Sequence, residues 1–177
     1  MGCISKLGKA ILFNCDNGAT GISEMLLINM ADVATKAYNA GIVTLTLDSG
    51  AKAILVEANK KGVNATEELK TNDNAPTALT QGVTFTVYQK NANGTDIVNS
   101  ILNGTFIALC KLKEGTVVRA YGVGYGLVAT AISEDANANG GYTTITLSTP
   151  ENVIGELRYS FDGAAYNALR TAAIVAD

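Results

Sequence analysis

The segment Val83-Thr84-Phe85-Thr86-Val87-Tyr88 carries the pattern that decides the fold class. Apolar side chains alternate with threonines, which is the period of a half-buried β-strand. The apolar residues are expected to face a core. Thr84 and Thr86 are expected on the opposite face, because successive side chains of a strand point to opposite sides.

The same alternation recurs at Ile42–Leu47 and Tyr142–Ser148, and the odd-numbered positions of each segment are expected to share one face. Asn-Gly, Ser-Gly and Gly-Gly turns separate the short apolar segments, which favours a β-sandwich or barrel. The length of 177 residues suits a single domain, residues 1–177. Further strands are expected at Met25–Asn29, Ala53–Ala58, Thr105–Leu112, Thr116–Tyr121 and Leu127–Ser133.

One flanking α-helix is expected after the strand at Val83–Tyr88. Thr95 can cap a helix that begins at Asp96, and Asn103-Gly104 can end it. The apolar stripe of this helix, which is expected to face the core, consists of Ile97, Val98, Ile101 and Leu102.

Three segments have weaker patterns. Asp32–Ala40 suits a short helical turn, and Val63–Gly82 has no strong period and is expected to be a long loop or arm. In the C-terminal segment Glu151–Asp177, the residues Leu157, Tyr159 and Phe161 alternate as in a strand. The stretch Ala164–Val175 could close as a helix or as an extended edge.

Charge is sparse, at 16% of residues against about 25% in an average soluble domain. A surface with so few charged side chains suggests that a partner covers part of it. The net charge of −3 and the sequence pI of about 5.0 argue against binding of a nucleic-acid backbone as the main role. The densest basic spots, Lys60-Lys61 and Lys111-Leu112-Lys113, are typical of solvated strand ends.

Three cysteines, Cys3, Cys15 and Cys110, are too few and too scattered for a disulfide framework, and their odd number favours reduced thiols. No apolar run approaches the ~18 residues of a membrane span, so no membrane is expected among the partners. The N-terminus is a poor match to a signal peptide, because its apolar stretch stops at Asn14-Cys15-Asp16. It also misses an acylation pattern, since Lys6 stands where Ser or Thr is required.

The sequence offers little for catalysis. There is no histidine, which removes Ser-His-Asp and Cys-His arrangements and most catalytic zinc sites. The pairs Glu67-Glu68 and Glu134-Asp135 could serve a hydrolase, but adjacent residues on a strand point apart, and solvated charges are the expected explanation. We therefore expect no catalytic residues and no enzymatic activity.

Some segments resemble ligand-binding loops without their full spacing. Gly122-Val123-Gly124-Tyr125-Gly126 has its third glycine one position early for a dinucleotide fingerprint, so a bulged or tightly packed strand is expected. Gly8-Lys9 lacks the spacing of a P-loop. Asp135–Gly140 copies the first half of a calcium loop, but position twelve is Thr146, so a hairpin loop is expected, with an incidental cation as the alternative. No cofactor-binding or metal-binding residues are expected.

The outward strand positions carry threonine where an exposed strand often carries lysine. Threonine tolerates partial burial, so these faces suit sheets that meet neighbouring sheets. Plain β-propensity explains the same residues equally well. The positions are Thr44, Thr46, Thr84, Thr86, Thr144 and Thr146.

Taken together, the segments resemble the tail tube proteins of bacteriophages, particularly those of phages and prophages of Bacteroides-type hosts. The similarity is one of element order and local composition over most of the chain. The segments that carry it are Cys15–Gly18, Gly21–Asn29 with Asp32-Val33, Ile42–Leu47, Ala65–Leu69, Val83–Val87, Ile101–Gly104, Tyr121–Leu127 and Gly141–Leu147.

The resemblance implies a β-sandwich or barrel with a flanking helix, in subunits that close into hexameric rings and stack into a tube. It implies a virion protein, assembled in the cytoplasm of the bacterial host, with itself and other phage tail proteins as partners. DNA would be present only in transit through the lumen, where a neutral or acidic lining keeps it from sticking. The segment Val63–Gly82 resembles the arm that reaches a neighbouring subunit, so deleting Glu68–Ala78 should leave a folded monomer that cannot polymerise.

Other functions remain open from the sequence. A head–tail connector or decoration protein of a phage is a close alternative. A monomeric β-sandwich module that binds carbohydrate is another, although the chain has no Trp and its seven Tyr are spread out. An enzyme on a β scaffold is the third.

Overall fold

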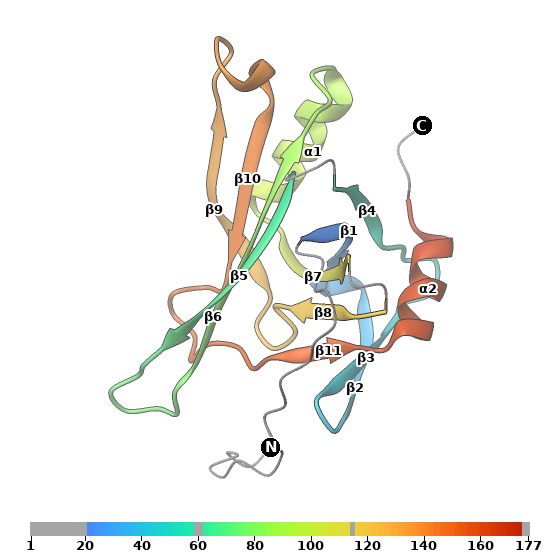
Figure 1. The fold of residues 1–177 in the computed structure, drawn as a ribbon, viewed down its shortest axis with the longest axis vertical. Coiled ribbons are helices and arrows are strands. Elements are labelled where there is room, and N and C mark those ends of the chain that lie inside the picture. The colour runs from blue at the N-terminus through green and yellow to red at the C-terminus, as the bar shows by residue number, and fades with distance from the viewer. Residues whose placement is uncertain (1–20, 59–61, 114–115, 175–177) are drawn as a thin grey trace.

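A computed structural model describes residues 21–58, 62–113 and 116–174, and Figure 1 shows their path. The protein is mainly β and sandwich-like, as the sequence predicts. Each strand expected from the alternation coincides with an observed strand. The strands are β1 (Ile22–Asn29), β2 (Val33–Asn39), β3 (Ile42–Leu47), β4 (Ile54–Glu57), β5 (Val63–Lys70), β6 (Ala78–Val87), β7 (Thr105–Leu112), β8 (Val118–Tyr121), β9 (Leu127–Glu134), β10 (Thr143–Ser148) and β11 (Tyr159–Phe161); the α-helices are α1 (Ala92–Leu102) and α2 (Gly163–Ala172), and the 3-10 turns are η1 (Met30–Asp32) and η2 (Asn139–Gly141).

The strands form one large mixed sheet that bends into two layers. Its order is β2-β3-β11-β8-β7-β9-β10-β6-β5, and β1 pairs with β7 and β4 beside this path. β7 meets β9 only at two positions, through Thr105 and Phe106, and the sheet turns there. Beyond the turn, β9, β10, β6 and β5 make a four-stranded antiparallel sheet of longer strands, on the left of Figure 1. Among the described residues the sheet does not close into a barrel, because β2 and β5 end its path.

Strands β1 and β7 are buried on both faces, and they separate two apolar clusters. Met25 and Leu27 pack in the cluster that lies against the four-stranded sheet. Leu26 and Ile28 point the other way, into a cluster that includes Tyr166 of α2. This double burial explains why the sequence of these two strands is apolar without alternation.

The C-terminal segment forms both a strand and a helix. β11 pairs in parallel with β3 and antiparallel with β8. The side chain of Asp162 accepts a hydrogen bond from the backbone N–H of Ala165 at 2.8 Å and so caps α2. α2 then flanks the shorter strands on the right of Figure 1, with Tyr166 buried and Arg170 paired to Glu24 at 3.0 Å. Of the two alternatives for Ala164–Val175, the helix is the one observed through Ala172.

The prediction of a short helix at Asp32–Ala40 is wrong. Only Met30–Asp32 forms a 3-10 turn, and β2 follows it as an edge strand. Ala40 and Gly41 have φ of 48° and 86° and make the two-residue turn that joins β2 to β3. Positive φ at both positions is typical of the type I′ hairpin turn, which is usually Asn-Gly, so the sequence signal was weak.

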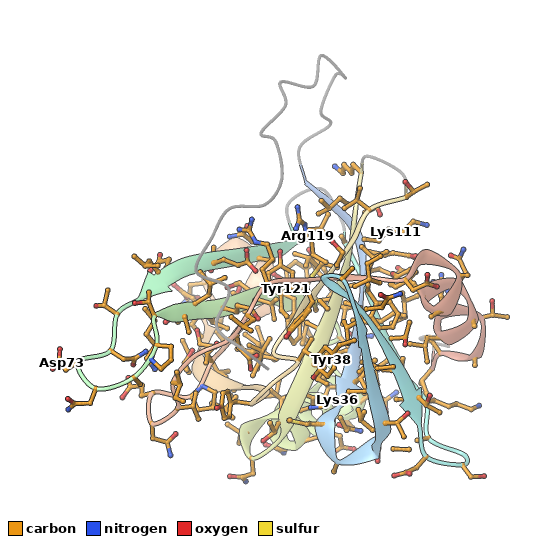
Figure 2. The ribbon with its side chains drawn as sticks, turned by 90° about the horizontal axis from the view of Figure 1, so that it is seen from below. Lys36, Tyr38, Asp73, Lys111, Arg119 and Tyr121 are labelled. Atoms are coloured by element: carbon orange, nitrogen blue, oxygen red, sulfur yellow. The ribbon has the colours of Figure 1, made fainter. Side chains whose placement is uncertain are left out.

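The prediction of a long loop at Val63–Gly82 is also wrong. This segment is the β5–β6 hairpin, in which eight consecutive residue pairs run from Val63–Phe85 to Lys70–Ala78. β5 shows little apolar alternation because it is an edge strand with one face exposed. Figure 2 shows the turn that carries Asp73 projecting from the body on the side away from α2, so the segment still forms an arm.

The flanking helix α1 starts one turn before the predicted cap. Its N-cap is Asn91, whose side chain accepts a hydrogen bond from the backbone N–H of Gly94 at 3.3 Å, and Thr95 lies inside the helix. The apolar stripe faces the core only in part, because Ile97 and Leu102 are 37% and 53% exposed. Neither helix of the described chain is long and apolar enough to cross a membrane.

Candidate assembly surface

Four of the six threonines that were predicted to point outward lie together on the four-stranded sheet. Thr86 pairs with Thr144 across β6 and β10, and Thr84 pairs with Thr146. The hydroxyl oxygens of Thr84 and Thr146 lie 3.0 Å apart and share a hydrogen bond. All four are half-buried and lie on the side opposite the core. We call this side of the four strands the threonine face; Thr44 and Thr46 lie apart from it on β3.

The threonine face carries small and uncharged side chains over most of its area. Strand alternation and the observed register place one residue in two of each strand on it. Its charged residues are Glu68 and Lys70, both near the tip of the β5–β6 hairpin. The other residues are Asn64 and Thr66 on β5, Ala78, Thr80, Gly82, Thr84 and Thr86 on β6, Thr144, Thr146 and Ser148 on β10, and Val128, Ala131 and Ser133 on β9.

The four-stranded sheet has an open edge on each side. β5 pairs only with β6, so its outer edge has no partner strand within the described chain. β9 pairs with β7 only at its first two residues, so Ala129–Glu134 is open in the same way. Unpaired edges display backbone N–H and C=O groups that can pair with another chain.

Each edge keeps a short neutral stretch without lysine or proline, although α1 packs against β9. Natural edge strands are usually blunted by lysine, proline or a bulge. β9 has one bulge at Thr130 and no charge before Glu134, so Ala131–Ser133 is regular and neutral. On β5, the first four residues, 63–66, are neutral. Both edges therefore leave a neutral stretch available for pairing.

A segment between β10 and β11, Thr149–Arg158, holds the β5–β6 hairpin in place, and we call it the strap. The backbones of Leu79 and Glu156 exchange two hydrogen bonds of 2.9 and 2.7 Å. Near the hairpin tip, Lys70 Nζ donates to the carbonyl oxygen of Val153 at 2.7 Å. The strap thus ties the hairpin to the body at several points along its length.

A buried glutamine links the hairpin to the rest of the fold. Gln81 is fully buried, and its Nε2 donates to Glu67 Oε1 at 2.9 Å. Its Oε1 accepts a hydrogen bond from the backbone N–H of Gly122 at 2.9 Å. Glu67 also forms an ion pair with Arg158 of the strap. Every partner in this network is satisfied, which is what makes a buried polar group stabilising and not costly.

The glycine-rich segment Gly122–Gly126 is a turn between β8 and β9, which corrects the prediction of a bulged or tightly packed strand. The first and last glycines have φ of 72° and 81° and so end the strands. The carboxylate of Glu156, 2% exposed, accepts hydrogen bonds from the backbone N–H groups of Gly124 and Tyr125 at 2.8 and 2.6 Å. An internal carboxylate therefore occupies the N–H groups that a dinucleotide phosphate would need.

Burial raises the pKa of the Glu156 carboxyl above its usual value. The N–H groups of Tyr125 and Gly124 and the nearby charge of Lys36 oppose this rise. Lys36 Nζ donates to the carbonyl oxygen of Val123 at 2.6 Å, and burial lowers the pKa of Lys36. These groups anchor the strap to β2 and to the β8–β9 turn, and each has an internal partner.

The carboxylate pairs singled out in the sequence do not converge. Glu67 points to Gln81 and Arg158, whereas Glu68 is exposed on the threonine face. Glu134 Oε2 accepts a hydrogen bond from the hydroxyl of Thr143 at 2.8 Å. Glu67 is thus a paired strand residue, not the solvated loop charge that was expected.

The calcium-like segment Asp135–Gly140 lies in the β9–β10 hairpin loop, as predicted. Asp135 Oδ1 accepts a hydrogen bond from the backbone N–H of Asn137 at 2.9 Å, and Thr146 lies in the middle of β10. Within residues 21–58, 62–113 and 116–174, no three His, Cys, Asp or Glu residues gather as metal ligands would. Cys110 is buried in β7, where desolvation raises the pKa of its thiol. The predictions made for Met1–Lys9, for Asn14–Gly18 and for Lys60-Lys61 lie outside the described residues.

The tyrosines give little support to a carbohydrate platform. Tyr88 and Tyr142 meet edge to face, with an interplanar angle of 70°, and Lys90 lies over the Tyr142 ring. Tyr38 and Tyr159 are tilted by 51°. Neither pair presents two coplanar rings to a sugar.

Comparison of the chain with known protein families, with curated proteins and with solved structures found no match.

Proposed function

We propose that this chain is a structural subunit whose copies join edge to edge into a ring, and that the rings stack into a bacteriophage tail tube. The observation that supports this proposal is the pair of neutral open edges, on β5 and β9, that flank the threonine face. A tube built from such rings would be a virion component assembled in the host cytoplasm.

The two edges have compatible directions. All pairs in the order β9-β10-β6-β5 are antiparallel, so β5 runs opposite to β9. When a second copy continues the sheet, its β9 lies antiparallel to the first copy's β5. The sheet can then continue from copy to copy with one pairing pattern, and each junction satisfies two open edges at once.

Edge pairing of this kind is heterologous, because one surface of each copy meets a different surface of the next. Such contacts close into rings when the rotation between copies divides a full turn. Six copies with four strands each would make a barrel of roughly 24 strands, which is wide enough for an aqueous channel.

The threonine face would line that channel in the proposed ring. Nucleic-acid binding depends mainly on Lys and Arg contacts. The threonine face has one lysine, Lys70, whose ammonium already donates to the carbonyl oxygen of Val153 and is offset by Glu68, so the face offers a phosphate backbone little attraction. The apolar clusters on the other side of the sheet fix which face turns inward, since that side is already covered by β1 and β7. DNA could then pass without sticking.

Light scattering and negative-stain microscopy of the purified full chain test the proposal. We expect particles several times the mass of one subunit, seen as rings with a central hole and as stacks of rings. A chain that stays monomeric at high concentration would contradict the proposal, and saturable binding to a glycan array by that monomer would favour the carbohydrate module.

A further inference from the structure

A groove of about 720 Å³ lies between β4, the C-terminal end of β6 and α1. Its walls are mostly apolar, and several of the lining residues belong to the main apolar cluster. The groove is therefore a place where the core opens to the surface. The apolar lining includes Leu27, Val56, Phe85, Val87, Ile97 and Phe106.

The rim of the groove is acidic in the described part of the chain. Glu57 on β4 and Asp96 on α1 are among the lining residues, and no described lining residue is basic. Neither acid takes part in an ion pair within residues 21–58, 62–113 and 116–174. A fitting occupant would combine several apolar side chains with positive charge.

We infer that the groove binds the segment Ile4–Phe13 of a second copy of this chain. This segment contains two lysines, Lys6 and Lys9, and no acidic residue. It has the composition that the groove requires, and a groove of this size holds several side chains of that kind. Its large apolar residues are Ile4, Leu7, Ile11, Leu12 and Phe13.

We assign the segment to a second copy because the proposed tube needs a contact that joins one ring to the next. The carbonyl oxygen of Gly21 accepts a hydrogen bond from the backbone N–H of Lys113, beside the first residue of β1. The groove lies at the other end of β1, where Leu27 and Asn29 line it. At ~3.3 Å per residue, the two ends of this strand are about 20 Å apart, a distance that residues 14–20 can span, so the ring-mixing experiment below separates binding between copies from binding within one copy.

Binding of this segment to the groove of a second copy is a head-to-tail contact, which repeats without limit. This inference rests on the proposed function, because it assigns the contact between stacked rings. Edge pairing would close each ring, and the segment–groove contact would join one ring to the next.

The test uses two full-length variants assembled separately. Ile97→Glu places a charge inside the groove, and the double variant Leu7→Glu, Ile11→Glu removes the apolar character of the segment. Each variant alone should form rings and no stacks. The control Ile42→Glu, at an exposed position on β3, should give stacks like the unmodified chain.

Mixing the two kinds of preformed ring is the decisive step. The Ile97→Glu ring keeps its segments, and the Leu7→Glu, Ile11→Glu ring keeps its grooves, so the mixture should give pairs of rings and nothing longer. Stacks of normal length from either variant alone, or a mixture without pairs, would overturn the inference.

A peptide-binding measurement tests this inference separately from the ring proposal. A fluorescent synthetic peptide of residues Met1–Thr20 should bind the full-length unmodified chain saturably, and Ile97→Glu should weaken that binding by roughly tenfold or more, about 1.4 kcal/mol. This measurement can be made on monomers as well as on rings. If the chain forms no rings, the ring proposal fails, but peptide binding still shows whether the groove binds the segment. Absence of saturable binding would overturn the inference.

Discussion

Val63 on β5 and Ile132 on β9 lie at the same level of the four-stranded sheet, at its two open edges. The register runs from Val63 to Phe85, from Phe85 to Ile145 and from Ile145 to Ile132. The neutral stretches of the two edges are therefore level with each other. A copy placed beside another can join them with little displacement along the strands, and this relationship underlies the predictions about assembly.

Lysines on the β9 edge should prevent ring closure. The double variant Ala131→Lys, Ser133→Lys places charge next to the edge that pairs with β5, and edge lysines oppose strand addition. We expect a folded monomer by light scattering, with an unchanged circular dichroism spectrum. The control Thr46→Lys lies on β3, outside the threonine face, and should still form rings. Rings formed by the double variant would contradict the proposal that the β9 edge pairs with β5 of the next copy.

Deleting Glu68–Ala78 should leave a folded monomer that does not polymerise. Glu67 pairs with Gln81, so the deletion leaves Leu79 and Thr80 to form a two-residue turn between them. The shortened β5 loses three of its eight residues and thus part of its edge. Thermal unfolding should remain cooperative, whereas sedimentation should show one subunit. Normal tubes from the deletion variant would refute the role of the hairpin.

Gly155→Ala should destabilise the strap. Gly155 has φ of 119°, and an added Cβ would lie 2.9 Å from both Ala78 Cβ and the carbonyl oxygen of Leu79. The control Gly50→Ala shares the positive φ, at 84°, but would meet nothing within 4 Å. We expect Gly50→Ala to cost about 1–2 kcal/mol in free energy of unfolding and Gly155→Ala a further 1–3 kcal/mol. Equal losses in urea unfolding would mean that the close contact with the hairpin does not matter.

Stability should depend on pH through Glu156. Because burial raises the pKa of this carboxyl in the folded state, the folded protein holds the proton more tightly than the unfolded chain. The contribution of Glu156 to stability is therefore fully present below the ordinary value of 4.5 and is lost as pH rises through the folded pKa.

Glu156→Gln tests that dependence. The variant is destabilised at every pH, because one of the two N–H groups of Gly124 and Tyr125 then faces an amide NH₂. Urea unfolding of both proteins from pH 4 upward should show the unmodified chain losing stability relative to the variant. A constant difference across this range would contradict the assigned direction of the shift.

The strands that could be predicted from the sequence are those with one buried and one outward face. In β3, β6 and β10 the observed burial alternates as the sequence predicts. The continuous apolar sequences of β1 and β7 follow from burial of both faces of these strands. The sequence did not predict β2 and β5, because an edge strand buries little apolar surface and therefore shows little apolar alternation. Such a strand can be predicted only from the turn that joins it to its partner strand. The turn at Ala40-Gly41 illustrates this, since its chemistry is not the usual Asn-Gly.

The candidate surface could be predicted only in part. The outward threonines of β6 and β10 were readable from their spacing, but the open edges were not, because an edge depends on which strands pair in space. The anchor at Glu156 was also missed. A glutamine within an apolar strand, Gln81, was the one signal in the sequence that pointed to a buried polar network.

Disulfide cross-linking of the two edges tests the central claim most directly. Asn64 on β5 and Ala131 on β9 lie on the threonine face and at the same level, through Thr84 and Thr146. Directly opposite residues of antiparallel strands have Cβ atoms about 4.5–5.5 Å apart, near the separation that a disulfide spans.

The experiment uses Asn64→Cys with Ala131→Cys, and in a second chain Asn64→Cys with Ser133→Cys, to allow for a shift between copies. Cys3, Cys15 and Cys110 are replaced in both. The pair Asn64→Cys with Thr46→Cys serves as the control. Under mild oxidation, edge-to-edge assembly predicts a ladder of covalent oligomers that ends at the ring size for a β5–β9 pair and is absent for the control. Monomer bands alone from both β5–β9 pairs, or a ladder from the control, would contradict the account.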